Sequence, residues 1–232
     1  MTRFEIAGKK VCLFGEENRN SPLVILNTFG DEGESVWNEC RAVGCPPFSL
    51  GAISSLDWNT DMSPWENPAI YKNDTAFLGG ADSYLKLLTD EIIPSIRSSL
   101  SSEPAYTALG GYSLAGLFAV YAAHKTAVFS RIASMSGSLW YPRFAEYALS
   151  SGFAAKIDFI YLSLGDAEAK TRNPILRSVQ EKTEALYSYW QSKGIPIRYE
   201  LNKGNHFAAA TERTARGLQQ LLLHSSAVCI AE

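Results

Sequence analysis

The residues best placed to do chemistry surround Ser113, in the segment Gly-Gly-Tyr-Ser-Leu-Ala-Gly at 110–116. A short apolar run at 105–109 comes before this segment, and an apolar run of helical character at 114–123 follows. The pattern predicts a strand, a tight turn and a helix, with the serine hydroxyl exposed at the tip of the turn. Strand and helix backbones pass close together there, so the residues two before and two after the serine must be small, as they are in this G-x-S-x-A. The segment therefore indicates a serine nucleophile.

A serine hydroxyl is a poor nucleophile at neutral pH, and it needs an imidazole to take its proton and a carboxylate to orient that imidazole. His206 lies between the last predicted strand, 197–201, and the last predicted helix, 208–223. A loop there lies at the carboxyl end of the sheet, where sites gather. His124 and His224 lie at helix ends, where capping or packing explains them better. We therefore predict that His206 is the general base.

Two acidic residues, Asp166 and Glu168, follow the strongest predicted strand, 157–164. In a site with the chain order serine, acid, histidine, the acid should follow the strand before the histidine. A position three residues after the strand-ending Gly165 and a longer side chain favour Glu168. Asp166 remains the alternative acid.

A tetrahedral intermediate also needs backbone N–H groups that donate to its oxyanion. The first predicted donor is the N–H of Leu114, directly after the nucleophile. The second should come from the loop that follows the apolar strand at 23–27. In this chain, either Thr28 or Phe29 would supply it.

Strands and helices alternate along the chain, which predicts an α/β fold with a largely parallel sheet and helices on both faces. A hairpin at 4–14 adds an antiparallel N-terminal edge. The other predicted strands are 23–27, 48–53, 105–109, 131–135, 157–164 and 197–201, and the predicted helices are 81–96, 114–123, 144–149, 174–192 and 208–223. No repeat or linker divides the chain, so we expect a single domain over residues 1–232.

Residues 57–79 are rich in Asn, Asp, Pro and Gly and read as a long loop, and a loop of that length is usually functional. This loop contains Trp58 and Trp65, and Trp140 follows a later strand. Aromatic faces of this kind bind substrate with little loss of entropy. The three tryptophans are therefore candidates to line an acyl or aryl pocket.

Composition excludes several classes of protein. The 232 residues are 46% hydrophobic and 19% charged, and a net charge of −3 without a basic run argues against a nucleic-acid partner. No apolar stretch approaches the roughly 18 residues of a membrane span, and the N-terminus lacks the apolar core of a secretory signal, so we expect a cytoplasmic protein without a membrane partner. Whether it forms a homo-oligomer is left open.

The four cysteines, Cys12, Cys40, Cys45 and Cys229, form no CxxC pair, and there are only three histidines, so neither a metal site nor a cofactor is expected. Cys40 and Cys45 flank a short loop and could pair in an oxidising compartment. In a cytosolic chain, four free thiols are expected.

With these motifs in place, the chain resembles the putative-esterase family of α/β-hydrolases, over residues 23–223. The resemblance rests on G-G-Y-S-L-A-G-L at 110–117, L-S-L-G-D-A-E at 162–168 and G-N-H-F at 204–207, with D-W-N-T-D-M-S-P-W at 57–65 and G-G-A-D at 79–82. The family includes enterochelin-type trilactone esterases, S-formylglutathione hydrolases, feruloyl esterases and mycolyltransferases. The chain departs from the family at Asn-Thr-Phe, 27–29, which replaces a more usual Asp-Gly beside the second oxyanion donor.

The resemblance implies an α/β-hydrolase fold and hydrolysis of a small carboxylic ester through an acyl-enzyme, with a siderophore-type lactone or an aryl ester among the candidate substrates. Two alternatives stay open. One is a thioesterase or acyltransferase that uses the same three residues, and the other is a non-catalytic binding protein that keeps the fold.

Overall fold

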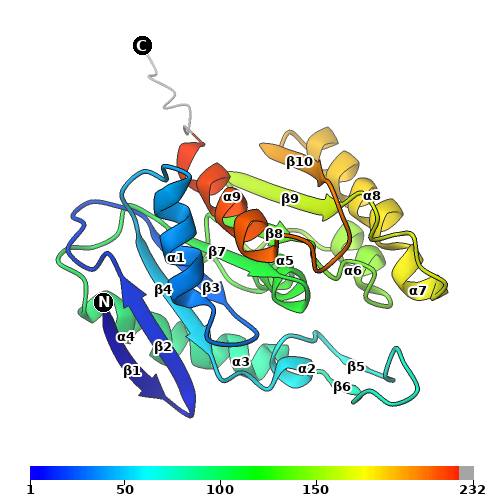
Figure 1. Cartoon of the computed structure of the whole chain (residues 1–232), viewed down its shortest axis with the longest axis horizontal. Coiled ribbons are helices and arrows are strands. Elements are labelled where there is room, and N and C mark those ends of the chain that lie inside the picture. The colour runs from blue at the N-terminus through cyan, green and yellow to red at the C-terminus, as the bar shows by residue number, and fades with distance from the viewer. Residues whose placement is uncertain (225–232) are drawn as a thin grey trace.

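An eight-stranded sheet forms the centre of the protein, in a computed structural model that describes residues 1–224 (Figure 1). The strand order is β1-β2-β4-β3-β7-β8-β9-β10, and the six strands from β4 to β10 in this order are parallel to one another. Their bounds are β1 (Thr2–Ile6), β2 (Lys9–Phe14), β3 (Leu23–Asn27), β4 (Ser49–Ser54), β7 (Thr107–Tyr112), β8 (Arg131–Met135), β9 (Phe159–Gly165) and β10 (Ile197–Asn202). The antiparallel β1 and β2 form one edge. The predicted largely parallel sheet with an N-terminal edge hairpin is confirmed.

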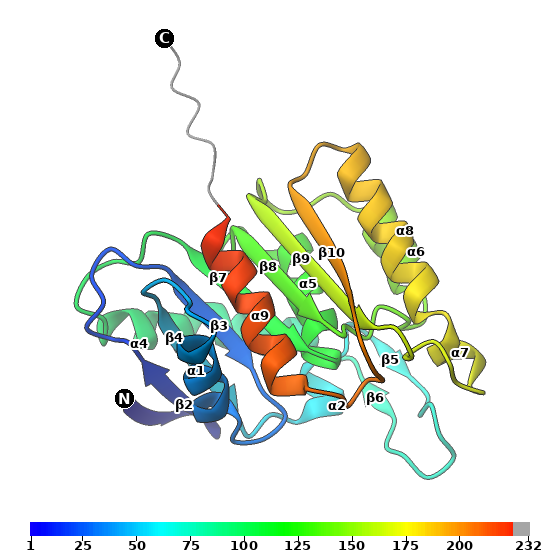
Figure 2. The same cartoon turned by 45° about the horizontal axis from the view of Figure 1, so that its top comes forward.

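Helices cover both faces of this sheet. On one face, α1 (Gly33–Ala42) and α9 (Ala210–Leu223) lie side by side (Figures 1 and 2). On the other face lie α5 (Leu114–Lys125), α6 (Phe144–Ser150) and α8 (Val179–Ser192). Successive residues of β3 alternate between the two cores: Leu23 and Ile25 join one, and Val24 and Leu26 join the other. An apolar run without polar alternation is the pattern that a strand covered on both faces requires.

Helix α1 is an element that the sequence patterns did not predict. Its buried residues are only Gly33, Val36 and Cys40, so its apolar stripe is narrow and its periodicity weak. Gly33 lets the helix approach the sheet closely, because a Cβ there would lie 2.5 Å from the Cβ of Ala52. Packing against β2, β4 and α9 stabilises a helix whose own pattern is weak.

The helix predicted at 81–96 forms, but its hydrogen-bonding pattern changes from α-helical to π-helical in the middle. It consists of α3 (Ala81–Leu87), a π-helical turn η1 (Leu88–Ile92) and α4 (Ile93–Ser98). Pro94 lies at the start of α4. Proline lacks an N–H group and clashes with the carbonyl one turn earlier, which accounts for the wider turn before it.

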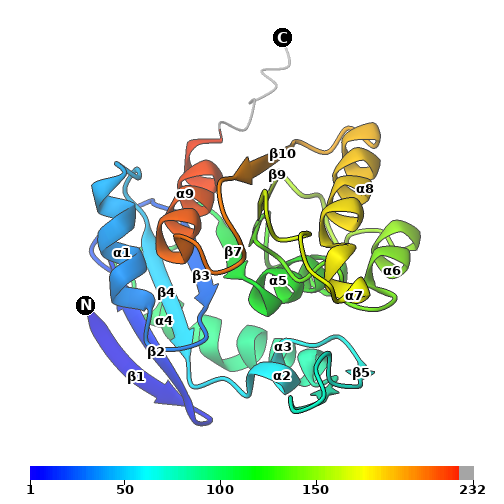
Figure 3. The ribbon, with the colours of Figure 1, turned by 45° about the vertical axis from the view of Figure 1, so that its right-hand side comes forward.

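The parallel strands all end at one edge of the sheet, and the segments after them carry the predicted site residues. The segment 57–79, expected to be a loop, contains a short helix α2 (Trp58–Asp61) and a small hairpin of β5 (Glu66–Asn67) and β6 (Phe77–Leu78). After β9, the short α7 (Pro174–Arg177) is capped by the side chain of Asn173 and leads into α8. Helix α8 and the β1–β2 hairpin lie on opposite sides of the molecule (Figure 3). Within residues 1–224, no helix combines the length and apolarity that crossing a membrane requires.

Candidate active site

Ser113 lies at a strained turn between β7 and α5. Its backbone has φ 59° and ψ −124°, a region that residues other than glycine rarely adopt. The turn is tight: a Cβ at Gly111 would lie 2.3 Å from the backbone of Ala115, so only glycine fits there. The N–H of Ser113 donates to the carbonyl of Met135 (3.1 Å), which ties the turn to the end of β8. Strain held in place by its surroundings is typical of a functional position.

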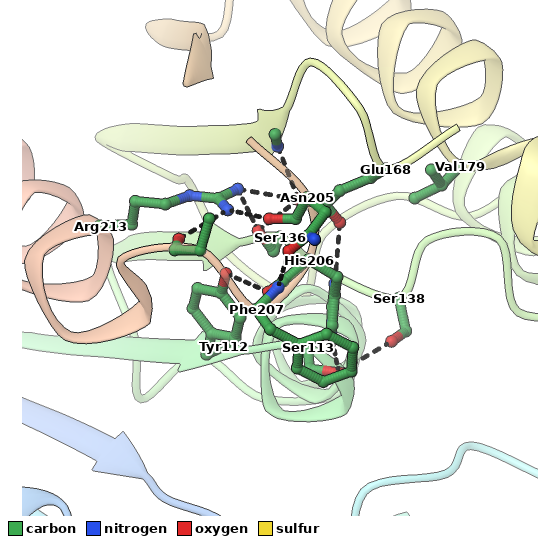
Figure 4. Close-up of polar contacts among 12 residues, drawn as sticks. Tyr112, Ser113, Ser136, Ser138, Glu168, Val179, Asn205, His206, Phe207 and Arg213 are labelled. Atoms are coloured by element: carbon green, nitrogen blue, oxygen red, sulfur yellow. Dashed lines mark hydrogen bonds and ion pairs between the residues drawn. The ribbon is translucent and has the colours of Figure 1, made fainter. Parts of the chain in front are cut away.

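The structure brings Ser113, His206 and Glu168 together in one chain of hydrogen bonds (Figure 4). The Nε2 atom of His206 lies 3.0 Å from Ser113 Oγ, and its Nδ1 atom lies 2.8 Å from Glu168 Oε2. The hydroxyl of Tyr112 donates to the backbone carbonyl of His206 (2.7 Å) and so holds the histidine loop. An imidazole between a hydroxyl and a carboxylate can take a proton from the first while the second fixes its orientation.

The two candidate acids have different surroundings. The Glu168 side chain is 4% exposed, and its Oε1 atom accepts hydrogen bonds from Ser136 Oγ (2.7 Å), the N–H of Gly165 (2.6 Å) and Arg213 Nη2 (2.8 Å). Asp166 is exposed, and its carboxylate accepts from the N–H of Gly204 (2.9 Å). Glu168 therefore contacts the imidazole, whereas Asp166 holds the turn against the histidine loop.

The environment keeps Glu168 ionised. Burial raises the pKa of its carboxyl group, but hydrogen bonds from His206, Arg213, Ser136 and the Gly165 N–H outweigh burial and lower this pKa to about 2. The carboxylate is thus fully charged at neutral pH and acts as an acceptor only.

Arg213 is a site residue that the sequence patterns missed. It lies in the first turn of α9, is 4% exposed, and forms an ion pair with Glu168. Arg213 lies four and eight positions before Gly217 and Leu221, which places it on the buried face of α9. An arginine at that position of an amphipathic pattern is unusual without a charged partner, and this periodicity was the available signal.

The candidate oxyanion donors differ in the hydrogen bonds that their N–H groups already make. Leu114 is the first residue of α5, so its N–H has no acceptor within the helix. The N–H of Thr28 already donates to the carbonyl of Ile53 (2.9 Å), because β-type pairing continues one residue beyond β3. Thr28 is therefore corrected as a donor, and Phe29, which lines a cavity together with Ser113, remains the candidate.

Two cavities open at Ser113, one on each side. The first, of about 350 Å³, is lined by residues that include Asn27, Phe29, Trp58, Tyr112 and Thr214. The second, of about 360 Å³, is lined by residues that include Tyr71, Ser138, Trp140, Lys170 and Val179. Ser113, His206 and Phe207 line both, and the Phe207 side chain is 86% exposed. An ester bound over Ser113 would therefore have space for a group on each side of its carbonyl carbon.

The three candidate tryptophans lie in different surroundings. Trp58 lines the first cavity and packs edge-on against Phe29, with ring centroids 5.3 Å apart, and Trp140 lines the second cavity. Trp65 lines neither, which corrects the expectation that it faces the substrate. Its Nε1 atom donates to the carbonyl of Pro142 (3.0 Å), and its ring packs in a cluster with Tyr121, Tyr141, Phe144 and Tyr147. These contacts fix the start of the β5–β6 hairpin against α6.

The remaining histidines and cysteines lie outside this site. His124 is buried, and its Nδ1 atom lies 3.0 Å from the carbonyl of Gly152, whereas His224 stacks on Phe159. Cys12, Cys40 and Cys45 are free thiols, and Cys229 lies outside the described residues. Among residues 1–224, no group of three or more His, Cys, Asp or Glu side chains could hold a metal ion.

Comparisons with known proteins agree with this fold. A crystal structure of an IroE-like serine hydrolase from Shewanella oneidensis matches 95% of this chain and 79% of its own, with a TM-score of 0.73 and 17% identity. The siderophore hydrolase EstA from Aspergillus nidulans matches 95% of this chain and 94% of its own, with a TM-score of 0.70 and 18% identity. Likenesses of this kind show the α/β-hydrolase fold.

Sequence comparison identifies the family. The uncharacterized protein YbbA of Bacillus subtilis (strain 168) is 29% identical over 164 residues, which cover 69% of this chain and 64% of that relative, so the match spans less than two thirds of the relative's length. The model of the family described as Putative esterase matches residues 53–210, more than half of the 232 residues. The chain therefore belongs to the Putative esterase family.

Proposed function

We propose that the protein is a serine carboxylic-ester hydrolase that works through an acyl-enzyme, with Ser113 as nucleophile, His206 as general base and Glu168 as the orienting acid. The observation that carries the proposal is the hydrogen-bonded chain from Ser113 Oγ through His206 to Glu168, built on a serine at φ 59°. Three residues from separate loops meet in the geometry that activates a hydroxyl.

The reaction follows from this geometry. Ser113 Oγ attacks the ester carbonyl carbon while His206 Nε2 takes the hydroxyl proton, and the carbonyl oxygen becomes an oxyanion. The N–H groups of Leu114 and Phe29 would donate to that oxyanion. When the carbon–oxygen bond to the alcohol breaks, the imidazolium gives its proton to the leaving oxygen and the acyl group stays on Ser113. Water then attacks the acyl-enzyme by the same steps, which releases the acid and restores the serine.

We further propose that the substrate is a small ester whose acyl and alcohol parts occupy the two cavities beside Ser113. Trp58, Phe29, Trp140 and Phe207 offer aromatic surface on both sides of the nucleophile, which favours an aryl group. The Aspergillus nidulans protein of similar fold is named a siderophore hydrolase, so a lactone of siderophore type belongs in the substrate panel.

The test compares Ser113→Ala with the wild type on acetyl, aryl and feruloyl esters and on a cyclic trilactone. The variant should lose on the order of 10⁴-fold in kcat while it stays folded, and, unlike the wild type, it should not be labelled by a fluorophosphonate. The exposed Ser150 in α6 is the matched control, since Ser150→Ala should change neither result. Retention of more than a tenth of the wild-type activity by Ser113→Ala would reject the proposal.

A further inference from the structure

A second charge is buried behind the candidate acid. The guanidinium of Arg213 and the carboxylate of Glu168 are each 4% exposed and lie 2.8 Å apart. Glu168 uses its two oxygens for different partners: Oε2 faces His206 and Oε1 faces Arg213. The arginine thus sits on the far side of the carboxylate from the imidazole (Figure 4). A buried charge is costly to hold, so an arginine at this position needs an explanation.

The guanidinium also ties together the segments that form the site. One nitrogen, Nη2, donates to Ser136 Oγ at the end of β8 as well as to Glu168. The other, Nη1, donates to the carbonyls of Asn205 (3.1 Å) and Ala208 (3.4 Å), which flank His206 in the sequence. Arg213 therefore contacts the acid and both sides of the histidine loop through a fork that lysine cannot reproduce.

The charge of Arg213 changes the electrostatic environment of His206. During the proposed reaction His206 gains a proton, and an isolated carboxylate beside it would hold that proton strongly. Here Arg213 neutralises the carboxylate, so the imidazole faces a pair without net charge. With less net negative charge beside it, the imidazolium gives up its proton more readily, while the hydrogen bond from Nδ1 still orients the ring.

Other titratable groups near Glu168 do not obscure this effect. Tyr112 and Tyr199 interact with the carboxylate, and burial raises the pKa of both phenols, so both stay neutral in the acid and neutral range. Arginine stays charged throughout that range. The acid side of the activity profile should therefore report on the Glu168–His206 pair.

We propose that Arg213 is a positioning residue that acts through Glu168: it fixes the outer carboxylate oxygen and cancels its charge, and in this way it extends esterase activity to lower pH. This inference rests on the proposed function. It goes beyond that proposal because it assigns a task to a residue that contacts neither the ester nor the nucleophile.

The experiment measures kcat/KM against pH for the wild type, Arg213→Met, Arg213→Lys and Arg213→Gln. The variants that lose the charge should move the acid side of the profile to higher pH by about one unit or more. Arg213→Lys keeps the charge but not the fork, so its profile should stay close to that of the wild type while kcat falls. Arg216, exposed on the same helix and paired with Glu200, provides the control, and Arg216→Met should leave the profile in place.

A second arm tests whether Arg213 acts through Glu168. At neutral pH, Arg213→Met should lower kcat/KM several-fold in the wild-type background and by less than about twofold in a Glu168→Gln background, since no oriented carboxylate remains there for the arginine to hold. An equal loss in both backgrounds, an unmoved profile in Arg213→Met, or equal shifts in the Met and Lys variants would overturn the inference. If Arg213→Met does not fold, the pH profiles of Arg213→Gln and Arg213→Lys are compared instead, and only the Gln variant should show the shift. Failure of all three variants to fold would show that Arg213 has a structural role only.

The Ser113→Ala variant is measured beside these. Residual esterase activity in that variant rejects the serine mechanism, whereas a serine-dependent activity with an unmoved pH profile rejects only the role of Arg213. The two failures are thus distinguishable.

Discussion

Replacing the Glu168 carboxylate by an amide should disable the site through the tautomer of His206. Three donors face Oε1 of Glu168, from Ser136, Gly165 and Arg213, and one group, His206 Nδ1, faces Oε2. In Glu168→Gln, an amide NH₂ on the Oε1 side would meet three donors, so the amide oxygen must take that side. The NH₂ then points at His206 Nδ1.

An Nδ1 atom that accepts a hydrogen bond carries no proton, so the ring proton must move to Nε2. That nitrogen would then donate toward Ser113 Oγ and could no longer take the serine proton. The same change of carboxylate to amide in a serine protease lowers kcat by about 10⁴-fold through the wrong tautomer, and we expect a loss on the order of 10³- to 10⁴-fold here. Because the amide oxygen still accepts from Arg213, the fold should lose only about 1–3 kcal/mol.

The assay is steady-state hydrolysis of an aryl ester at neutral pH, with thermal unfolding as a check on the fold. Asp166→Asn is the matched control, because its side-chain oxygen can still accept from the Gly204 N–H, and because the carboxylate that contacts His206 is that of Glu168. It should keep most of the activity. A larger loss in Asp166→Asn than in Glu168→Gln would refute the reasoning and move the acid to Asp166.

Three further predictions concern substrate binding, the turn at the nucleophile and stability. Trp58→Ala should raise KM for aryl esters more than for acetyl esters, by a factor that corresponds to about 1–3 kcal/mol. Trp65→Ala should instead lower the free energy of unfolding by about 2–4 kcal/mol and leave the aryl-to-acetyl ratio of KM unchanged. A changed ratio in Trp65→Ala would place that ring in the substrate site after all. Gly111→Ala should abolish activity and fluorophosphonate labelling, because its Cβ would lie 2.3 Å from the Ala115 backbone, and full labelling would show that the turn relaxes easily. Burial raises the pKa of Glu168, but its hydrogen bonds outweigh burial and lower this pKa from 4.5 to about 2 in the folded protein. The ionised carboxylate therefore stabilises the fold fully above pH 4.5, and this stabilisation is lost as the pH falls toward the pKa of the folded state. Between about pH 5 and pH 2 the wild type should therefore lose roughly 3 kcal/mol more stability than Glu168→Gln in chemical denaturation, and parallel losses would contradict the assigned shift.

Local patterns in the sequence were sufficient for the parts of the protein that depend on neighbouring residues. The turn at Ser113 is recognisable because small residues on both sides of it are a steric requirement of the turn itself. The buried strands are recognisable because a strand covered on both faces must be apolar at every position, as β3 is. The position of His206 followed from the rule that loops after parallel strands meet at one edge of the sheet.

Contacts between distant segments decided what those patterns left open. Asp166 and Glu168 are two residues apart, and only the approach of the β10 loop and α9 shows that Glu168 meets His206. Thr28 and Phe29 are adjacent, and the bond from Thr28 to Ile53 in β4 separates them. In each case the sequence pattern indicated a segment, and the choice between neighbouring residues depended on a partner far away along the chain.

The same reason explains the residues that the sequence assigned differently or missed. Trp65 and Trp58 lie in the same polar segment, but the ring of Trp65 contacts aromatic side chains of α5 and α6 and therefore packs against the core. Helix α1 has only a narrow apolar stripe, so its stability depends on packing against the sheet and α9. Arg213 has no local motif, since its partners lie 5 to 77 positions away in the sequence. The sequence by itself determined which reactive side chains are available and at which edge of the sheet they lie, because short-range sterics and periodicity fix both. The tertiary structure decided which atoms meet, because burial and hydrogen bonding are properties of the folded chain.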